Sequence, residues 1–179
     1  LEAAIKSIDQ YEAYQVIYMS PKGKLLKQEM LQAYEKTSDR FIIVSGCYEG
    51  VDSRFFDLFD VTCISIGDYV LSSGDLPGLV FAEGLMRLMP SYAKSVNAVH
   101  TDSFVSGLLE PRRYTRPENL YGHRLPAVLC SGNHQEIKAW NKRDAIRETL
   151  EKRPELLCKE QKQVGQEELR DVLKEMSEG

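Results

Sequence analysis

Three short β-rich runs, each followed by a glycine-containing loop, constrain the fold of this chain more than any other feature. The runs span residues 15–19, 41–45 and 61–66. Each is continuously β-rich rather than alternating apolar and polar, which is typical of strands buried on both faces of a parallel sheet. Helical patterns separate the runs. The order of strands and helices therefore predicts an α/β layer with a parallel sheet.

The helical patterns in the first half have different characters. Residues 24–36 carry an apolar stripe at helical spacing, which indicates an amphipathic helix. Residues 53–59 form a shorter piece that Asp52 is placed to cap. Residues 76–89 are apolar almost all round, with Asp75 in the N-cap position. We expect this last helix to be largely buried.

The second half of the chain is predicted to be mainly helical. Asn133, followed three residues later by Glu136, has the pattern of a helix-starting box for residues 135–152. A further amphipathic helix is expected over residues 166–176, and residues 128–130 read as a brief extended piece.

A change in composition divides the chain into two domains. Residues 90–112 are rich in Pro, Ser, Asn and Gly, which favours a linker or mobile loop. We predict an α/β domain over residues 1–92, a flexible interdomain linker over 93–112 and a small helical domain over 113–179.

Composition favours a cytosolic protein. No apolar run reaches the roughly 18 residues that a membrane span needs. The four cysteines lie far apart without a Cys-x-x-Cys pair, so we expect reduced thiols and no zinc or other metal site. The net charge of −4 argues against non-specific nucleic-acid binding, although basic residues gather in the second half.

The loops that follow the three runs are the best candidates for a ligand site, because ligands bind beyond the carboxyl ends of the strands in open α/β sheets. The second and third loops, which contain Gly46, Gly67 and Gly74, hold acidic residues and no Lys or Arg. Such loops disfavour phosphates. They suit a ligand with hydroxyls, an adenine edge and a positive centre, such as S-adenosylmethionine. Tight turns with capping acids are the alternative on composition alone.

A collinear series of motifs extends over nearly the whole chain. The motifs are residues 18–23 (YMSPKG), 46–52 (GCYEGVD), 65–72 (SIGDYVLS), 102–104 (DSF), 107–109 (GLL), 114–117 (YTRP), 129–134 (LCSGNH) and 153–157 (RPELL). This series closely resembles TrmD, the family of bacterial tRNA (guanine-N1)-methyltransferases. The chain departs from the family pattern at Cys47, Ser73 and Asp75.

The resemblance implies a fold of the SPOUT class, in which a parallel sheet with a trefoil knot is followed by a small C-terminal helical domain. It implies a cytoplasmic homodimer with the active site at the subunit interface. The implied reaction is methyl transfer from S-adenosyl-L-methionine to N1 of the guanosine 3′ to the anticodon of tRNA, a step of tRNA processing. The resemblance leaves a role for Mg²⁺ open.

The resemblance also implies which residues contact the cofactor. They are Tyr18, Pro21, Gly46, Tyr48, Glu49, Ile66, Gly67, Asp68, Tyr69, Val70, Leu71 and Gly74. Most of these contacts are expected from the backbone, so Ile66, Val70 and Leu71 could equally belong to the core. Glu49 is placed for the methionine amino group or a divalent ion, with capping of the next helix as the alternative.

Methylation of guanine N1 requires a general base, because N1 carries a proton, and a donor or cation for the charge that shifts onto O6. The resemblance assigns these catalytic roles to Asp102 and Arg87. We expect Asp102 to lie in a loop that orders over the bound guanine. A turn residue paired with Ser103 and an ion pair between Arg87 and Glu83 are the structural alternatives.

Arg112, Arg113 and Arg116, interleaved with Tyr114, are predicted to bind RNA through phosphates and stacking, or else to form a solvated charged surface. Two other functions stay open: a related enzyme acting on ribosomal RNA, and a non-catalytic RNA-binding module. The presence of Asp102 and Arg87 argues against the second.

Overall fold

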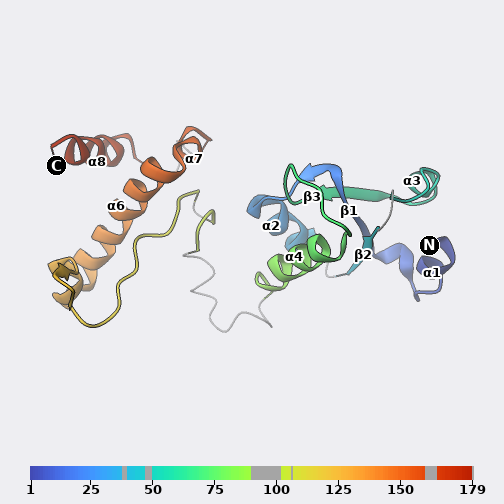
Figure 1. Cartoon of the computed structure of the whole chain (residues 1–179), viewed down its shortest axis with the longest axis horizontal. Helices are drawn as coiled ribbons and strands as arrows, with labels where there is room; N and C mark the ends of the chain where they lie inside the picture. The colour runs from blue at the N-terminus through green and yellow to red at the C-terminus, as the bar shows by residue number, and fades with distance from the viewer. Residues whose placement is uncertain (38–39, 47–49, 90–101, 106, 160–164, 179) are drawn as a thin grey trace. The chain divides into compact units, whose positions relative to one another are not determined.

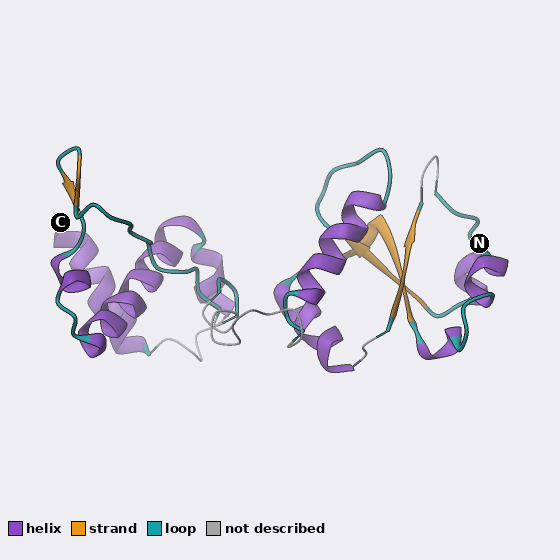
Figure 2. Ribbon diagram, turned by 90° about the horizontal axis from the view of Figure 1, so that it is seen from below, coloured by secondary structure: helices purple, strands orange, loops and turns teal. Residues whose placement is uncertain are grey.

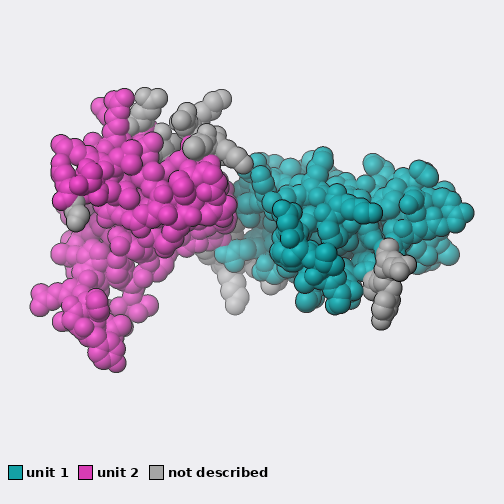
Figure 3. Space-filling model, turned by 45° about the horizontal axis from the view of Figure 1, so that its top comes forward, with its two compact units in different colours: residues 1–96 teal, residues 97–179 magenta. Residues whose placement is uncertain are grey.

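The computed structural model describes residues 1–37, 40–46, 50–89, 102–105, 107–159 and 165–178 (Figure 1). The chain divides into two compact units, Leu1–Val96 and Asn97–Gly179, which are coloured separately in Figure 3. No helix in the described ranges is both long and apolar enough to cross a membrane.

Unit 1 contains a parallel three-stranded sheet. Its strands are β1 (Gln15–Leu25), β2 (Phe41–Ser45) and β3 (Val61–Ser65), in the order β2-β1-β3. All three predicted strands are therefore confirmed. β1 continues beyond the predicted end, and its register shifts so that both Met19 and Lys24 pair with Ile64. For this reason the following helix begins later than residue 24.

Helices cover both faces of this sheet (Figure 2). The helical elements of unit 1 are α1 (Glu2–Lys6), η1 (Tyr11–Ala13), α2 (Gln28–Thr37), α3 (Phe55–Leu58) and α4 (Asp75–Met86). On one face, Leu31 of α2 and Phe81 of α4 pack against Ile17 and Ile64. On the other, residues of α1 and α3 pack in a second cluster around β1 and β2. Burial on both faces explains the continuous runs.

The helix α4 differs from the sequence expectation in two respects. Gly74 occupies the N-cap position, and Asp75 is the first helical residue. Only one side of the helix is buried, because Leu76 and Leu79 on the other side are 62% and 65% exposed. The apolar composition of α4 thus leaves an uncovered apolar face on this unit.

The described residues of unit 2 form a small hairpin, a 3-10 helix and three α-helices. Its elements are β4 (Asn119–Leu120), β5 (His123–Arg124), η2 (Ala127–Cys130), α6 (His134–Lys152), α7 (Pro154–Lys159) and α8 (Gln166–Glu178). Asn133 caps α6 as predicted, since its side chain accepts the backbone N–H groups of Gln135 and Glu136. The extended piece expected at residues 128–130 was wrong, because these residues lie in the 3-10 helix η2.

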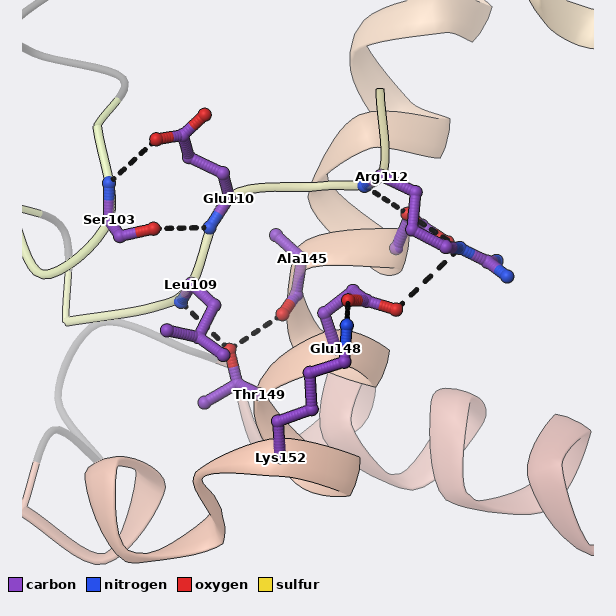
Figure 4. A network of polar contacts seen from close by, with 9 residues as sticks. Ser103, Leu109, Glu110, Arg112, Ala145, Glu148, Thr149 and Lys152 are labelled. Atoms are coloured by element: carbon purple, nitrogen blue, oxygen red, sulfur yellow. Dashed lines mark hydrogen bonds and ion pairs between the residues drawn. The ribbon is translucent and has the colours of Figure 1, made fainter. Parts of the chain in front are cut away.

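Unit 2 begins earlier than the sequence predicts. Part of the expected linker, residues 102–105 and 107–112, lies within the described residues, and its second half is bound to α6 (Figure 4). The backbone N–H of Leu109 donates to Thr149 Oγ1 at 2.9 Å. Leu108 is buried in the same core as Ile146 and Val172. The division at residue 113 therefore falls inside a folded unit.

Candidate functional site

A cleft of about 640 Å³ opens at the carboxyl end of the sheet in unit 1. It is built from residues 18–22 of β1, the end of β3 and the loops that follow β2 and β3. The residues that line it are Tyr18, Met19, Ser20, Pro21, Lys22, Gly46, Gly50, Val51, Ser53, Phe56, Cys63, Ile64, Ser65, Ile66, Gly67, Tyr69, Val70, Leu71, Ser72, Ser73, Gly74 and Pro77.

The strand order explains why these loops converge. Because β1 lies between β2 and β3, the segment after β3 must cross the carboxyl end of β1 to reach β2. It arrives there at Gly74, whose backbone N–H donates to Gly46 O at 2.9 Å. A Cβ atom on Gly74 would lie 3.1 Å from Ser45 Cα and 3.2 Å from Gly46 N. Glycine therefore permits the close approach of the two loops.

The loop after β3 is folded on itself. Ser65 Oγ donates to Gly67 O at 3.0 Å, and the Gly67 N–H donates back to Ser65 Oγ at 3.2 Å. Tyr69 Oη donates to Ile66 O at 3.3 Å, which places the tyrosine ring against Gly67. Val70 is 84% exposed, so its assignment to the core does not hold. Residues of this turn line the cleft.

An aromatic pair forms another wall of the cleft. The rings of Tyr18 and Phe56 meet edge to face, with their centroids 5.6 Å apart. Tyr18 is buried and Phe56 is partly exposed. Sequence reasoning missed Phe56, which lies in α3 outside any glycine motif. No local pattern in the sequence marks Phe56, because only the fold brings it to Tyr18.

Asp52 holds the turn before α3 through hydrogen bonds with Arg54. Its Oδ1 accepts the Arg54 N–H at 2.9 Å, and the Arg54 guanidinium lies against the same carboxylate. The hydrogen bond from the Arg54 side chain holds the pKa of Asp52 below its usual range. Asp52 thus shapes the turn before α3. Its predicted capping role was wrong, because Arg54 is the N-cap residue of α3 and makes no side-chain capping hydrogen bond.

Most predicted cofactor residues that the structure describes meet at this cleft. Those that line it are Tyr18, Pro21, Gly46, Ile66, Gly67, Tyr69, Val70, Leu71 and Gly74. Asp68 is not among the lining residues. Tyr48 and Glu49, together with Cys47, lie outside the described residues.

The chemistry of the lining suits a ligand with hydroxyls and an aromatic ring. Several serines, among them Ser20 and Ser72, offer hydroxyl groups, and Lys22 is the one basic residue in the described lining. One cation is few for a polyphosphate site. Among the described residues, no group of three or more His, Cys, Asp or Glu side chains could hold a metal ion.

Neither of the two predicted catalytic residues is among the residues that line the cleft. Arg87 is the exposed C-cap residue of α4, where its backbone N–H donates to Glu83 O at 2.9 Å. Asp102 belongs to unit 2 and is half-buried, and its carbonyl accepts the Val105 N–H at 3.4 Å.

Arg112, predicted to contact RNA, is engaged within unit 2 (Figure 4). Its backbone N–H donates to Asp144 Oδ2 at 2.8 Å, and its Nε donates to Asp144 Oδ1 at 3.0 Å. Asp144 is only 2% exposed. Its hydrogen bond raises the pKa of Arg112 further above the usual range. Arg113 and Arg116 are exposed, and the Arg113 guanidinium lies 3.5 Å from Glu110 Oε2.

Comparison with known proteins finds one matching family. The model of tRNA (Guanine-1)-methyltransferase TrmD matches residues 1–159. The chain is 40% identical to the tRNA (guanine-N(1)-)-methyltransferase of Thermosynechococcus vestitus over 159 residues, which is 89% of this chain and 67% of the relative. It is 43% identical to that of Nitrosococcus oceani over 144 residues, which is 80% of this chain and 57% of the relative. The chain thus spans between 57% and 67% of the length of these relatives.

Proposed function

Since this chain belongs to the TrmD family of tRNA (guanine-1)-methyltransferases, we propose that it transfers a methyl group from S-adenosyl-L-methionine to N1 of the guanosine 3′ to the anticodon of tRNA. The observation that carries this proposal is the cleft at which β1 and the loops after β2 and β3 meet. The proposal places the reaction in the cytoplasm, where unmodified tRNA is available, and leaves a role for Mg²⁺ open.

The cleft fits the cofactor in size and chemistry. Its volume of about 640 Å³ lies in the range of small-molecule sites. The loops at Gly46, Gly67 and Gly74 would enclose the adenine and ribose, beside the Tyr18 and Phe56 rings. Asp68, Tyr48 and Glu49 are proposed as further contacts on the family resemblance. When bound, the cofactor supplies a methyl group on a sulfonium, whose leaving thioether is neutral.

Two side chains are proposed to handle charge on the guanine. The Asp102 carboxylate accepts the N1 proton, so that the N1 lone pair can form the new N–CH₃ bond as the S–CH₃ bond breaks. Arg87 stabilises the negative charge that shifts onto O6. Asp102 lies in a short turn held by backbone hydrogen bonds, which is compatible with a base presented at a set position.

The architecture supports two further parts of the proposal. The segment that crosses the end of β1 and docks at Gly46 is the path expected of a trefoil knot of the SPOUT class. The uncovered apolar face of α4, with Leu76, Leu79 and Val80 at helical spacing, suits a second copy of the chain. We therefore propose a homodimer with the active site at the subunit interface.

The function is tested by incubating the full chain with labelled S-adenosylmethionine and unmodified tRNA. We expect label in N1-methylguanosine. Asp102→Ala should bind the cofactor like the parent chain and lose turnover by roughly 10²- to 10⁴-fold. Asp171→Ala, which removes an exposed carboxylate of α8, is the matched control and should keep full activity. Absence of N1-methylguanosine would overturn the function, and unchanged turnover of Asp102→Ala would overturn the assignment of the base.

A further inference from the structure

The hairpin β4–β5 of unit 2 carries a tyrosine at its tip. Tyr121 and Gly122 form the two-residue turn between Leu120 and its partner His123. Both turn residues have positive φ, 52° and 89° respectively, as a type I′ turn requires. The Gly122 N–H donates to Asn119 Oδ1 at 2.9 Å, which closes the turn. The hairpin therefore fixes the direction of the Tyr121 Cα–Cβ bond.

Tyrosine is an unusual choice for this position. Asn, Asp or Gly is favoured at the first position of a type I′ turn, because a bulky residue is strained at positive φ. The Tyr121 side chain is 95% exposed, so packing within unit 2 does not hold it there. A strained backbone position occupied by an exposed aromatic side chain points to a role in binding rather than folding.

The surroundings of the tip indicate the kind of partner. Residues 112–124 contain four arginines and a single acidic residue, Glu118, in a chain with a net charge of −4. Arg116, His123 and Arg124 are exposed. An exposed ring among cations is the combination by which proteins bind single-stranded nucleic acid, where bases stack on aromatics and phosphates meet Lys or Arg.

We propose that Tyr121 stacks on an unpaired base of the RNA substrate and that Arg124 contacts a neighbouring phosphate. This inference rests on the proposed function and deepens it, because it assigns to the β4–β5 hairpin a contact separate from the arginines at positions 112, 113 and 116. The two-residue turn holds the ring at the end of the hairpin, so little freedom is lost when a base stacks on it.

The test compares Tyr121→Asn with Tyr121→Phe in the full chain. Asparagine removes the ring and is favoured at this φ, so the hairpin should persist, whereas phenylalanine keeps the stacking surface. The probes are unmodified tRNA and a fully paired RNA duplex with the same number of phosphates. We expect Tyr121→Asn to weaken tRNA binding by roughly 5- to 100-fold, and to leave duplex binding unchanged. Tyr121→Phe should bind both RNAs like the parent chain.

Arg124→Gln separates the phosphate contact from the stacking contact. It should weaken binding of both RNAs and lower the slope of log affinity against log salt by about one unit. An unchanged slope would overturn the phosphate contact.

Three results would overturn the stacking contact. The first is tRNA affinity of Tyr121→Asn within twofold of the parent, and the second is an equal loss for tRNA and duplex. The third is an altered oligomeric state with unchanged RNA affinity, which would assign the tip to a protein contact. If the parent chain itself fails to bind or methylate tRNA, the proposed function is overturned. If the parent chain binds and methylates tRNA but Tyr121→Asn binds tRNA equally well, only the stacking contact is overturned.

Discussion

Asp144 shows how a single buried residue decides the role of its neighbours. Its carboxylate accepts the backbone N–H and the guanidinium of Arg112, and Arg112 Nε also lies 3.7 Å from Glu148 Oε1. The sequence shows a cluster of arginines but not which of them faces a buried acid 32 residues away. The phosphate role proposed for the cluster therefore falls more naturally on Arg113 and Arg116.

Replacement of Asp144 should destabilise unit 2. Asp144→Ala removes the partner of Arg112 and leaves its backbone N–H without this acceptor, so we expect a loss of about 2–3 kcal/mol in the free energy of unfolding. Arg112 is partly exposed, and its rehydration keeps the loss below that of a fully buried pair. Urea unfolding followed by the fluorescence of Trp140, the only tryptophan, reports on this unit.

Arg113→Ala, which removes a largely exposed side chain, is the control and should change the free energy of unfolding by less than about 0.5 kcal/mol. Equal stability of Asp144→Ala and the parent would contradict the anchoring role.

At the scale of elements, the sequence pattern predicted whether a segment is a helix or a strand better than it predicted where the segment ends or which of its sides is buried. The three β-rich runs are strands, and the Asn133 cap begins α6, because these signals are local. Other features, such as where β1 ends, depend on contacts between residues that are distant in the sequence. The pairing of Lys24 with Ile64 extends β1 into the predicted helix. The exposed side of α4 could not be seen from a composition that is apolar all round.

The helix α8 provides a test of packing in unit 2. Val172 is fully buried in the core with Ile146 and Leu157, whereas the neighbouring Leu173 is about half exposed. We expect Val172→Ala to lower the free energy of unfolding by about 2 kcal/mol, since it removes two buried methyl groups and leaves a small cavity. Leu173→Ala is the matched control and should cost well under half as much. Thermal unfolding of the two variants measures the difference, and equal losses would show that α8 does not pack through Val172.

At the scale of the whole molecule, the sequence predicted which segments meet at the cleft and misplaced a boundary. The predicted first loop is part of β1, and it meets the glycine-containing loops after β2 and β3 at one cleft, because the carboxyl ends of parallel strands share an edge. Phe56 escaped prediction because only the fold brings it to Tyr18. The segment at residues 107–112 resembled a linker in composition, yet Thr149 and Asp144 bind its backbone. Composition does not reveal such partners.

Amide hydrogen exchange of the full chain, with and without S-adenosylmethionine, tests the central claim most directly, because it asks where the cofactor binds. We predict slower exchange in residues 19–22 of β1 and in the loop at residues 66–74. We expect little change in α6 of unit 2, where a second cavity of about 320 Å³ lies beside Trp140. Protection confined to unit 2, or no protection at saturating cofactor, would contradict the assignment of the cleft.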